Sequence, residues 1–271
     1  MFDSNKLLII FKIMTKQYKP WRLTWEIDSA LIDSVKKFYS KHENNTFVKI
    51  RKKRNIEKQD LNLTKEFLWQ TLIICLLTSQ QKSGPNSRVS LFCGTKPFPL
   101  SLNFCVENLD ILEIEAQKVL QSFGGLRRST IIAEHLKENL QTLIGNNWEI
   151  LSHIDTESTL KTEKEIELFL VQNIQKQIKG FGPKQSRNFL QILGLTKYEI
   201  PLDSRISDWL NKFNFPIKLS AAGLSDPYFY QFISEGIQNL CEKAEIYPCL
   251  LDAAIFSSYD KDEWTEENSI F

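Results

Sequence analysis

The sequence predicts an all-α fold, and three observations support this prediction. Apolar residues recur at helical spacing in several segments, helix start and stop signals lie between these segments, and the alternating pattern of a strand is scarce. Only residues 6–25 and 46–51 favour an extended conformation, so a small N-terminal extended element is also predicted. The predicted helices are 27–40, 64–80, 106–123, 126–143, 162–177, 183–193, 204–213, 226–242 and 249–258.

The first three helices are predicted from their apolar pattern and their ends. The first carries an apolar stripe at spacings of three or four residues from Ile27 to Phe38. The second begins after Thr64, a typical N-cap residue, and is apolar nearly all round, which is typical of a central, buried helix. The third ends at the pair Gly124-Gly125, a typical C-terminal cap.

The later helices have clear start signals. The fourth follows the glycine pair and is predicted to hold Arg127 and Arg128 in its first turn. Thr162 and Glu165 form a capping box at the start of the fifth. The helix near the C-terminus begins at Asp226, where a capping aspartate precedes a proline that suits the first helical position.

The composition is that of a soluble globular protein. The 271 residues allow one large domain or two modest ones, and 42% are hydrophobic and 25% charged. These values exclude a disordered chain, a fibrous chain and a disulfide-rich miniature protein. The five cysteines show no paired C-x-x-C spacing, so we expect buried free thiols rather than zinc or iron–sulfur ligands. An apolar run at 7–11 is too short to cross a membrane, and the protein is expected to be intracellular.

Charge is unevenly distributed along the chain. Residues 1–61 carry 14 Lys or Arg against 7 Asp or Glu, whereas residues 201–271 carry 5 against 12. The sharpest basic run, KIRKKR at Lys49–Arg54, fits either a solvated segment or a stripe that binds phosphate groups. Charge alone does not separate these two interpretations.

The most informative stretch is 174–210. Gly180-Phe181-Gly182 predicts a tight turn, since glycine accepts a positive φ and a close approach of neighbouring segments. Pro183 suits the first position of the following helix. The amides at the start of that helix offer a site for an anion such as a DNA phosphate. A G-x-G before a helix is weak evidence of phosphate binding when taken alone.

Two residues of this stretch are candidate catalytic residues. Lys184 lies in the first turn of the helix, where the helix dipole disfavours a cation and favours a neutral, nucleophilic amine. The alternative is a surface lysine with its head group in water. Asp203 precedes the next helix and is therefore predicted to be its N-cap. A carboxylate at that position could also act as a base or stabilise a positive charge, so the two roles are compatible.

Together these residues resemble the helix–hairpin–helix DNA glycosylase superfamily. The match consists of G-x-G-x-Lys at Gly180–Lys184, followed by Leu-Asp before a helix at Leu202-Asp203. LLTSQQ at 76–81 resembles the end of the first core helix, which carries a glutamine that probes the duplex. LDAAIF at 251–256 is similar to the closing helix of the second 8-oxoguanine glycosylase family, where an aromatic lies near the damaged base. The resemblance covers about 64–258.

The sequence departs from the family pattern in several places. Arg205 stands where a histidine is common, Phe256 stands where the second oxoguanine family often has tryptophan, and the chain ends in Phe271 rather than in lysine. The four-cysteine cluster of the endonuclease III branch is missing. These departures concern the choice of lesion more than the lysine chemistry.

The resemblance implies two helical lobes with DNA bound in the cleft between them. One lobe would be 62–197, with the helix–hairpin–helix motif at about 164–194, and the other would combine 1–61 with 198–271. The implied partner is double-stranded DNA that contains a damaged base or an abasic site. A monomer that makes no contact with a membrane is expected, and no cofactor is implied.

The resemblance also implies a role for individual residues. Lys184 would be the nucleophile, Asp203 its essential partner, and Phe256 the aromatic of the lesion-base pocket. Arg205 could still contact a phosphate in place of the usual histidine. The implied DNA-binding residues are Gly180, Gly182, Gln80, Gln81, Arg205 and Lys179. The main-chain carbonyls implied to hold a monovalent cation are those of Lys176, Ile178 and Phe181; no side-chain metal site is implied.

The implied activity is base excision with strand nicking. The enzyme would flip an oxidised base out of the duplex, with 8-oxoguanine favoured, attack the sugar C1′ with the lysine, and nick by β-elimination. Two alternatives remain open. One is a monofunctional glycosylase of the same fold, and the other is a non-catalytic helix–hairpin–helix protein that binds DNA.

Overall fold

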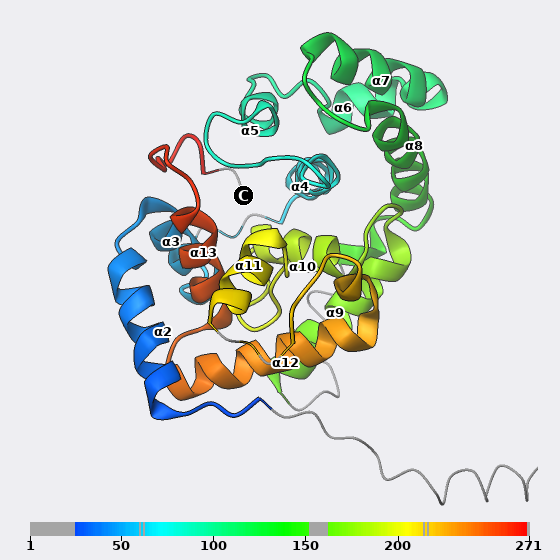
Figure 1. Ribbon diagram of the computed structural model, residues 1–271. Helices are drawn as coiled ribbons and strands as arrows, with labels where there is room; N and C mark the ends of the chain where they lie inside the picture. The colour runs from blue at the N-terminus through cyan, green and yellow to red at the C-terminus, as the bar shows by residue number, and fades with distance from the viewer. Residues whose placement is uncertain are drawn as a thin grey trace, which may run out of the picture.

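The structure is a computed structural model that describes residues 25–59, 61, 63–151, 162–213, 215 and 217–269. In these ranges it contains helices and no strand, which confirms the all-α fold class (Figure 1). The α-helices are α2 Ser29–His42, α3 Thr46–Arg51, α4 Lys65–Leu77, α5 Arg88–Cys93, α6 Leu102–Glu107, α7 Leu112–Phe123, α8 Ser129–Gly145, α9 Glu163–Gln177, α10 Pro183–Ile192, α11 Ser204–Lys212, α12 Pro227–Ala244 and α13 Pro248–Ser258. None of these helices combines the length and the apolar character needed to cross a membrane.

Several helices begin at the predicted caps. The Thr64 hydroxyl accepts a hydrogen bond from the Phe67 amide at the start of α4. Thr162 and Glu165 make both hydrogen bonds of the capping box at the start of α9. Asp226 caps α12 in the same way as Thr64 caps α4. These local bonds satisfy amides that have no partner within the helix.

The expectation of an extended segment at 46–51 is wrong. These residues form α3, which Asn45 caps by accepting a hydrogen bond from the Phe47 amide. Phe47 and Val48 are buried, and α3 packs against α13. Burial against other helices thus decides the conformation of a short segment rich in strand-forming residues. The other part of the expected extended element, 6–25, lies outside the described residues except for its last residue.

Two predicted helix boundaries also differ. The helix expected at 106–123 is divided into α6 and α7 by a 3₁₀ turn at Leu109–Ile111. The helix expected from 126 begins instead at Ser129, so the two arginines precede it, and Arg128 adopts a left-handed conformation with φ of 61°. The glycine pair and these arginines therefore form one extended turn between α7 and α8.

The buried side chains form two core clusters. The larger cluster combines residues from α3 to α10, and the smaller one combines residues from α2, α11, α12 and α13. In Figure 1, α5–α8 lie on one side of the molecule, and α2, α11 and α12 lie on the other. Helix α13 contributes Ala253 and Ala254 to the larger cluster and Leu251 and Ile255 to the smaller one, so it lies at their boundary.

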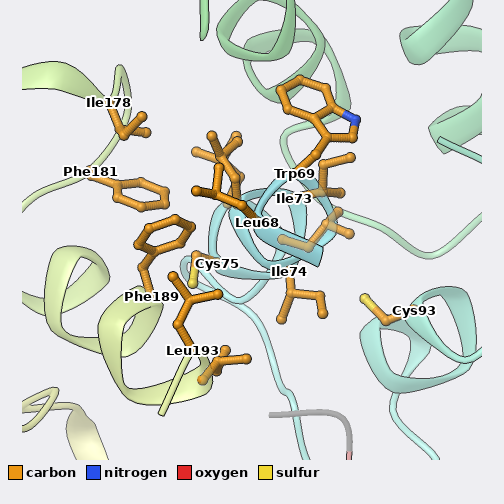
Figure 2. Packing of buried hydrophobic residues seen from close by; sticks show 14 of the residues in the cluster. Leu68, Trp69, Ile73, Ile74, Cys75, Cys93, Ile178, Phe181, Phe189 and Leu193 are labelled. Atoms are coloured by element: carbon orange, nitrogen blue, oxygen red, sulfur yellow. The ribbon is translucent and has the colours of Figure 1, made fainter. Parts of the chain in front are cut away.

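Helix α4 occupies the centre of the larger cluster, as its all-round apolar sequence predicts. Leu68, Trp69 and Cys75 are fully buried, and Figure 2 shows Phe181 and Phe189 on one side of α4 and Cys93 on the other. All five cysteines are buried free thiols. Burial also raises the pKa of the Cys93 thiol to about 12. These thiols therefore serve as small apolar side chains.

Replacing a side chain of α4 is expected to test this central position. Trp69→Ala should lower the free energy of unfolding by about 3–5 kcal/mol, because it removes a fully buried indole. The indole also donates a hydrogen bond to the Leu100 carbonyl, at 3.1 Å. The matched control is Phe169→Ala on α9, where the side chain is 44% exposed, and its effect should stay within about 0.5 kcal/mol. Denaturant unfolding measures both, and equal losses would contradict the central position of α4.

Candidate active site

The predicted hairpin joins α9 to α10 (Figure 1). Gly180 has a φ of +87°, and a Cβ atom there would lie 2.4 Å from Nδ1 of His135. Both its conformation and its surroundings therefore require glycine. Phe181 points into the core, where its ring packs edge-on against Phe189 at 5.6 Å between centroids. The turn is thus held between α8 and the core.

Asn139 of α8 fixes the backbone at the start of this turn. Its Oδ1 accepts a hydrogen bond from the Lys179 amide at 2.7 Å, and its Nδ2 donates to the Lys179 carbonyl at 3.0 Å. Asn139 is 1% exposed. The Lys179 side chain is exposed and lies 3.3 Å from Glu138. The sequence analysis did not identify Asn139. A polar asparagine on the buried face of a predicted helix is the signal that could have identified it.

The main-chain carbonyls predicted to hold a monovalent cation, those of Lys176, Ile178 and Phe181, belong to the same turn and the end of α9. The carbonyl of Ile178 accepts the turn hydrogen bond from the Phe181 amide, at 3.3 Å. The Lys176 carbonyl belongs to the last turn of α9. Among the described residues, no group of His, Cys, Asp or Glu side chains has an arrangement that could hold a metal ion. Cation binding by the three carbonyls stays a prediction.

Lys184 and Asp203 line one small cavity. Lys184 lies in the first turn of α10, directly after the hairpin, and is half-buried. Asp203 is the N-cap of α11, as predicted, and its Oδ1 accepts hydrogen bonds from the amides of Arg205 and Ile206 at 2.8 and 3.0 Å. These two bonds fix the direction of the carboxylate. The structure therefore places the predicted amine and carboxylate in the wall of one site, although they belong to different helices.

The cavity is small and adjoins a large groove. Its volume is about 30 Å³, and Lys184, Asp203, Thr78 and Ser83 belong to the linings of both the cavity and the groove. The groove has a volume of about 1230 Å³. The cavity thus has room for about two or three water molecules, so a nucleobase that enters it must displace side chains of its wall.

The predicted DNA-binding residues lie mostly along the groove, which is lined by Gly180, Gly182, Gln80, Gln81 and Arg205 among others. Gln80 is exposed and has a positive φ of 62°. Gln81 is half-buried, accepts a hydrogen bond from the Arg127 amide at 3.0 Å, and donates one to the Leu77 carbonyl. Gln81 therefore ties the end of α4 to the turn before α8, which leaves Gln80 as the better candidate for a contact with DNA.

Arg205 has partners within the protein. Its guanidinium lies 2.9 Å from Asp260 and donates a hydrogen bond to the Phe256 carbonyl at 2.7 Å. It also covers the Phe256 ring, at 3.9 Å from the centroid. These contacts hold the segment after α13 against α11. A contact between Arg205 and DNA phosphate stays a prediction.

Phe256 lines the cavity, and its role as the aromatic of the lesion-base pocket stays a prediction. It is half-buried, and its ring stacks on Phe47 of α3 with a centroid distance of 5.2 Å and an interplanar angle of 26°. Trp264 lies beyond it at 5.7 Å. Phe256 therefore belongs both to an aromatic group and to the cavity wall.

The sequence analysis did not identify two buried ionisable residues of the cavity wall, Asp252 and Arg51, as parts of the site. Asp252 is 5% exposed and lies 3.8 Å from the guanidinium of Arg51, which is also buried. The pKa of Asp252 is raised to about 7, mainly by burial; the positive charge of Arg51 opposes this rise and the negative charge of Asp203 adds to it. An aspartate inside the apolar run LLDAAIF is the signal that could have identified this residue, since a carboxylate is rarely buried without a partner.

The raised pKa of Asp252 predicts a pH-dependent stability. The ordinary pKa of this carboxyl is 3.8, so between about pH 4 and about pH 7 the folded state retains a proton that the unfolded state loses. The free energy of unfolding should therefore fall as pH rises through this window, by at most about 1.4 kcal/mol per pH unit from this group. Asp252→Asn should flatten that part of the curve. Denaturant unfolding at a series of pH values compares the two proteins, and parallel curves would exclude Asp252 as the cause.

No protein-family model matches the sequence, and no curated protein matches it. The solved structures of similar fold include the following two. The Methanocaldococcus jannaschii 8-oxoguanine DNA glycosylase is 20% identical, has a TM-score of 0.58, and is matched over 87% of this chain and 96% of that chain. The 8-oxoguanine glycosylase/lyase of that organism, crystallised with a 15mer DNA containing 8-oxoguanine, is 19% identical, has a TM-score of 0.60, and is matched over 86% of this chain and 100% of that chain.

These comparisons concern the fold. The matches extend over most of this chain and nearly all of each solved structure, so the similarity is not confined to the hairpin. The chain therefore shares the fold of these 8-oxoguanine glycosylases, as the resemblance of its hairpin, Lys184 and Asp203 to helix–hairpin–helix DNA glycosylases predicts.

Proposed function

We propose that the protein is a DNA glycosylase with abasic-site lyase activity that removes an oxidised base, with 8-oxoguanine favoured. The observation that carries this proposal is the convergence of Lys184 and Asp203 on one cavity at the edge of a large groove. A non-catalytic DNA-binding module needs the hairpin but gains nothing from an amine and a capped carboxylate in the wall of one cavity. The solved structure of similar fold that contains 8-oxoguanine DNA supports the choice of substrate.

The DNA partner would lie along the groove. The hairpin glycines and the exposed Gln80 line the groove, and backbone amides at the start of a helix are suited to a phosphate. A base stacked inside the duplex cannot reach Lys184, so the damaged nucleotide must rotate out of the helix. Gln80 would fill the space that this nucleotide leaves. We expect the protein to act as an intracellular monomer that binds the DNA between its two lobes, 62–197 and 1–61 with 198–271.

Lys184 would supply the nucleophile. Its neutral Nζ forms a bond to the sugar C1′, the bond between C1′ and the base nitrogen breaks, and the base leaves with the bonding electron pair and then takes up a proton. Nζ then loses a proton, the bond between C1′ and O4′ breaks as O4′ takes up a proton, and an iminium ion forms between Nζ and C1′. Loss of a proton from C2′ then expels the 3′ phosphate, which cuts the strand by β-elimination.

Asp203 would assist this sequence in two ways. Its carboxylate can accept the proton that Lys184 must lose before it attacks. Its negative charge also stabilises the positive charge that develops on the sugar when the base departs. The two backbone hydrogen bonds at the start of α11 hold the carboxylate in place, so little reorganisation is needed during the reaction.

Replacing Lys184 is the primary test of the proposal. Lys184→Gln should abolish both strand nicking and the adduct that borohydride traps between enzyme and DNA, because it removes the only proposed nucleophile. Duplex binding should remain nearly intact. The matched control is Lys118→Gln, which changes an exposed lysine of α7 that lines neither the cavity nor the groove and should still form the adduct. Base release without an adduct in the wild-type protein would favour the monofunctional alternative, and binding without base release would favour the non-catalytic one.

Replacing Asp203 distinguishes its role as the N-cap of α11 from its proposed role in the reaction. Asp203→Asn retains an oxygen that can cap α11, so the free energy of unfolding should change by about 1 kcal/mol or less. Turnover should fall by about 10²–10⁴-fold because the negative charge is lost. Asp226→Asn alters the equivalent cap of α12, outside the cavity and groove linings, and should leave turnover unchanged. Unchanged turnover in a folded Asp203→Asn protein would show that Asp203 serves only as the N-cap of α11.

A further inference from the structure

Two buried hydrogen-bond donors in the wall of the small cavity lack a hydrogen-bond partner. The side chain of Arg51 is 3% exposed and Gln191 is 1% exposed, yet neither Nη1 of Arg51 nor Nε2 of Gln191 makes a hydrogen bond. Of the unpartnered buried side-chain atoms in the described part of the chain, only these two belong to residues that line this cavity. Buried polar groups are nearly always satisfied, so this pair indicates a place for a polar partner, either water or a group of a ligand that displaces the water.

Asp252 lies beside these donors without satisfying them. Its Oδ2 is 3.8 Å from Nη1 of Arg51, which is an ion-pair distance rather than a hydrogen bond. The amide of Gln191 is close enough to lower the pKa of Asp252, although its Nε2 makes no hydrogen bond of ordinary geometry. The cavity therefore presents two donors and one acceptor next to each other, on residues that line the cavity and not the groove.

This pattern complements one edge of a nucleobase. We propose, on the basis of the proposed function, that Arg51 and Gln191 donate hydrogen bonds to a carbonyl oxygen of the flipped base while the ionised carboxylate of Asp252 accepts one from the adjacent ring N–H. A carbonyl beside a ring N–H is the edge shared by 6-oxopurines and 4-oxopyrimidines. Adenine-type and cytosine-type bases carry an amino group beside a ring acceptor, which would oppose donor to donor and acceptor to acceptor. The site thus selects oxo bases over amino bases.

Arg51, which is proposed to select the base, lies outside the part of the chain that resembles the glycosylase superfamily. Arg51 ends α3, whereas the resemblance covers about 64–258. The same helix supplies Phe47, which stacks on Phe256 in the cavity wall. Helix α3 therefore contributes both an apolar surface and a donor to the pocket. A planar guanidinium suits a carbonyl oxygen better than an ammonium does, because its donors have fixed directions.

Matched lesion pairs test this selection. The pairs are 8-oxohypoxanthine with 8-oxoadenine, and 5-hydroxyuracil with 5-hydroxycytosine, since the members of each pair share an oxidised position and differ only at the edge that carries the oxo or the amino group. Single-turnover excision of each base is divided by the nicking rate on an abasic site with the same preparation. The wild-type protein should favour the oxo member by about tenfold or more. The pair that is cut identifies the base as a purine or a pyrimidine.

Three variants assign the preference to particular side chains. Arg51→Lys keeps a positive charge near Asp252 but loses the planar donor group, and Gln191→Leu removes the other donor without changing any charge. Each should reduce the preference for the oxo member by about tenfold. Arg54→Lys is the control, because Arg54 donates to the Ile192 carbonyl and does not belong to the cavity lining. It should retain the wild-type preference.

The outcomes separate this inference from the proposed function. Equal normalised excision of both members of each pair by the wild-type protein would overturn the inference. An equal loss of preference in Arg54→Lys would also overturn it, because a general packing effect would then be the cause. If Arg51→Lys does not fold, the preference of Gln191→Leu for the oxo member of each pair is the test of the inference. Absence of abasic-site nicking and of a trapped adduct in the wild-type protein would instead overturn the proposed function.

Discussion

The packing of α10 against the buried helix α4 determines the position of the site. Gln185 of α10 donates a hydrogen bond to the Cys75 carbonyl of α4 at 2.5 Å, and the fully buried ring of Phe189 anchors the same helix. At the hairpin, a Cβ atom on Gly180 would lie 2.9 Å from Cδ2 of Leu76. These contacts prevent α10 from sliding along α4, so Lys184 in its first turn is held where the cavity meets the groove.

The site contains two aspartates in contrasting environments. Asp203 is half-buried at the start of α11, where two backbone amides donate to its carboxylate. Asp252 is buried between the two core clusters, and burial raises its pKa to about 7 despite the nearby guanidinium of Arg51. Contrasting environments allow two carboxyl groups of one site to have different tasks. Here the proposed tasks are charge stabilisation for Asp203 and base recognition for Asp252.

The pocket wall is assembled from distant parts of the chain. Phe47 of α3, Phe256 of α13 and Trp264 form one aromatic group, and the ion pair between Arg205 and Asp260 holds the segment after α13 in place. The cavity that results has room for only a few water molecules. A base could enter only if side chains of the wall moved, and Phe47 and Phe256 belong to that wall.

The sequence by itself determined the features that depend on near neighbours. The caps at Thr64 and Thr162, the glycine turn at Gly180, and the cap at Asp203 all follow from bonds or conformations within a few residues, which is why local patterns predict them. The all-α class follows from the same helical periodicity. The positions of Lys184 and Asp203 could be inferred from the spacing of the hairpin and the following cap, although only the fold brings both into one cavity.

Tertiary structure decided the features that depend on contacts between distant segments. The conformation of 46–51 follows from its packing against α13, which overrides its preference for a strand. The burial of Arg51 beside Asp252 could not be predicted from a basic run, because their partnership joins α3 to α13. Likewise, only the turn before α8 shows that Gln81 has a structural partner while Gln80 is exposed. Local sequence encodes bonds between near neighbours, whereas burial is decided by the whole chain.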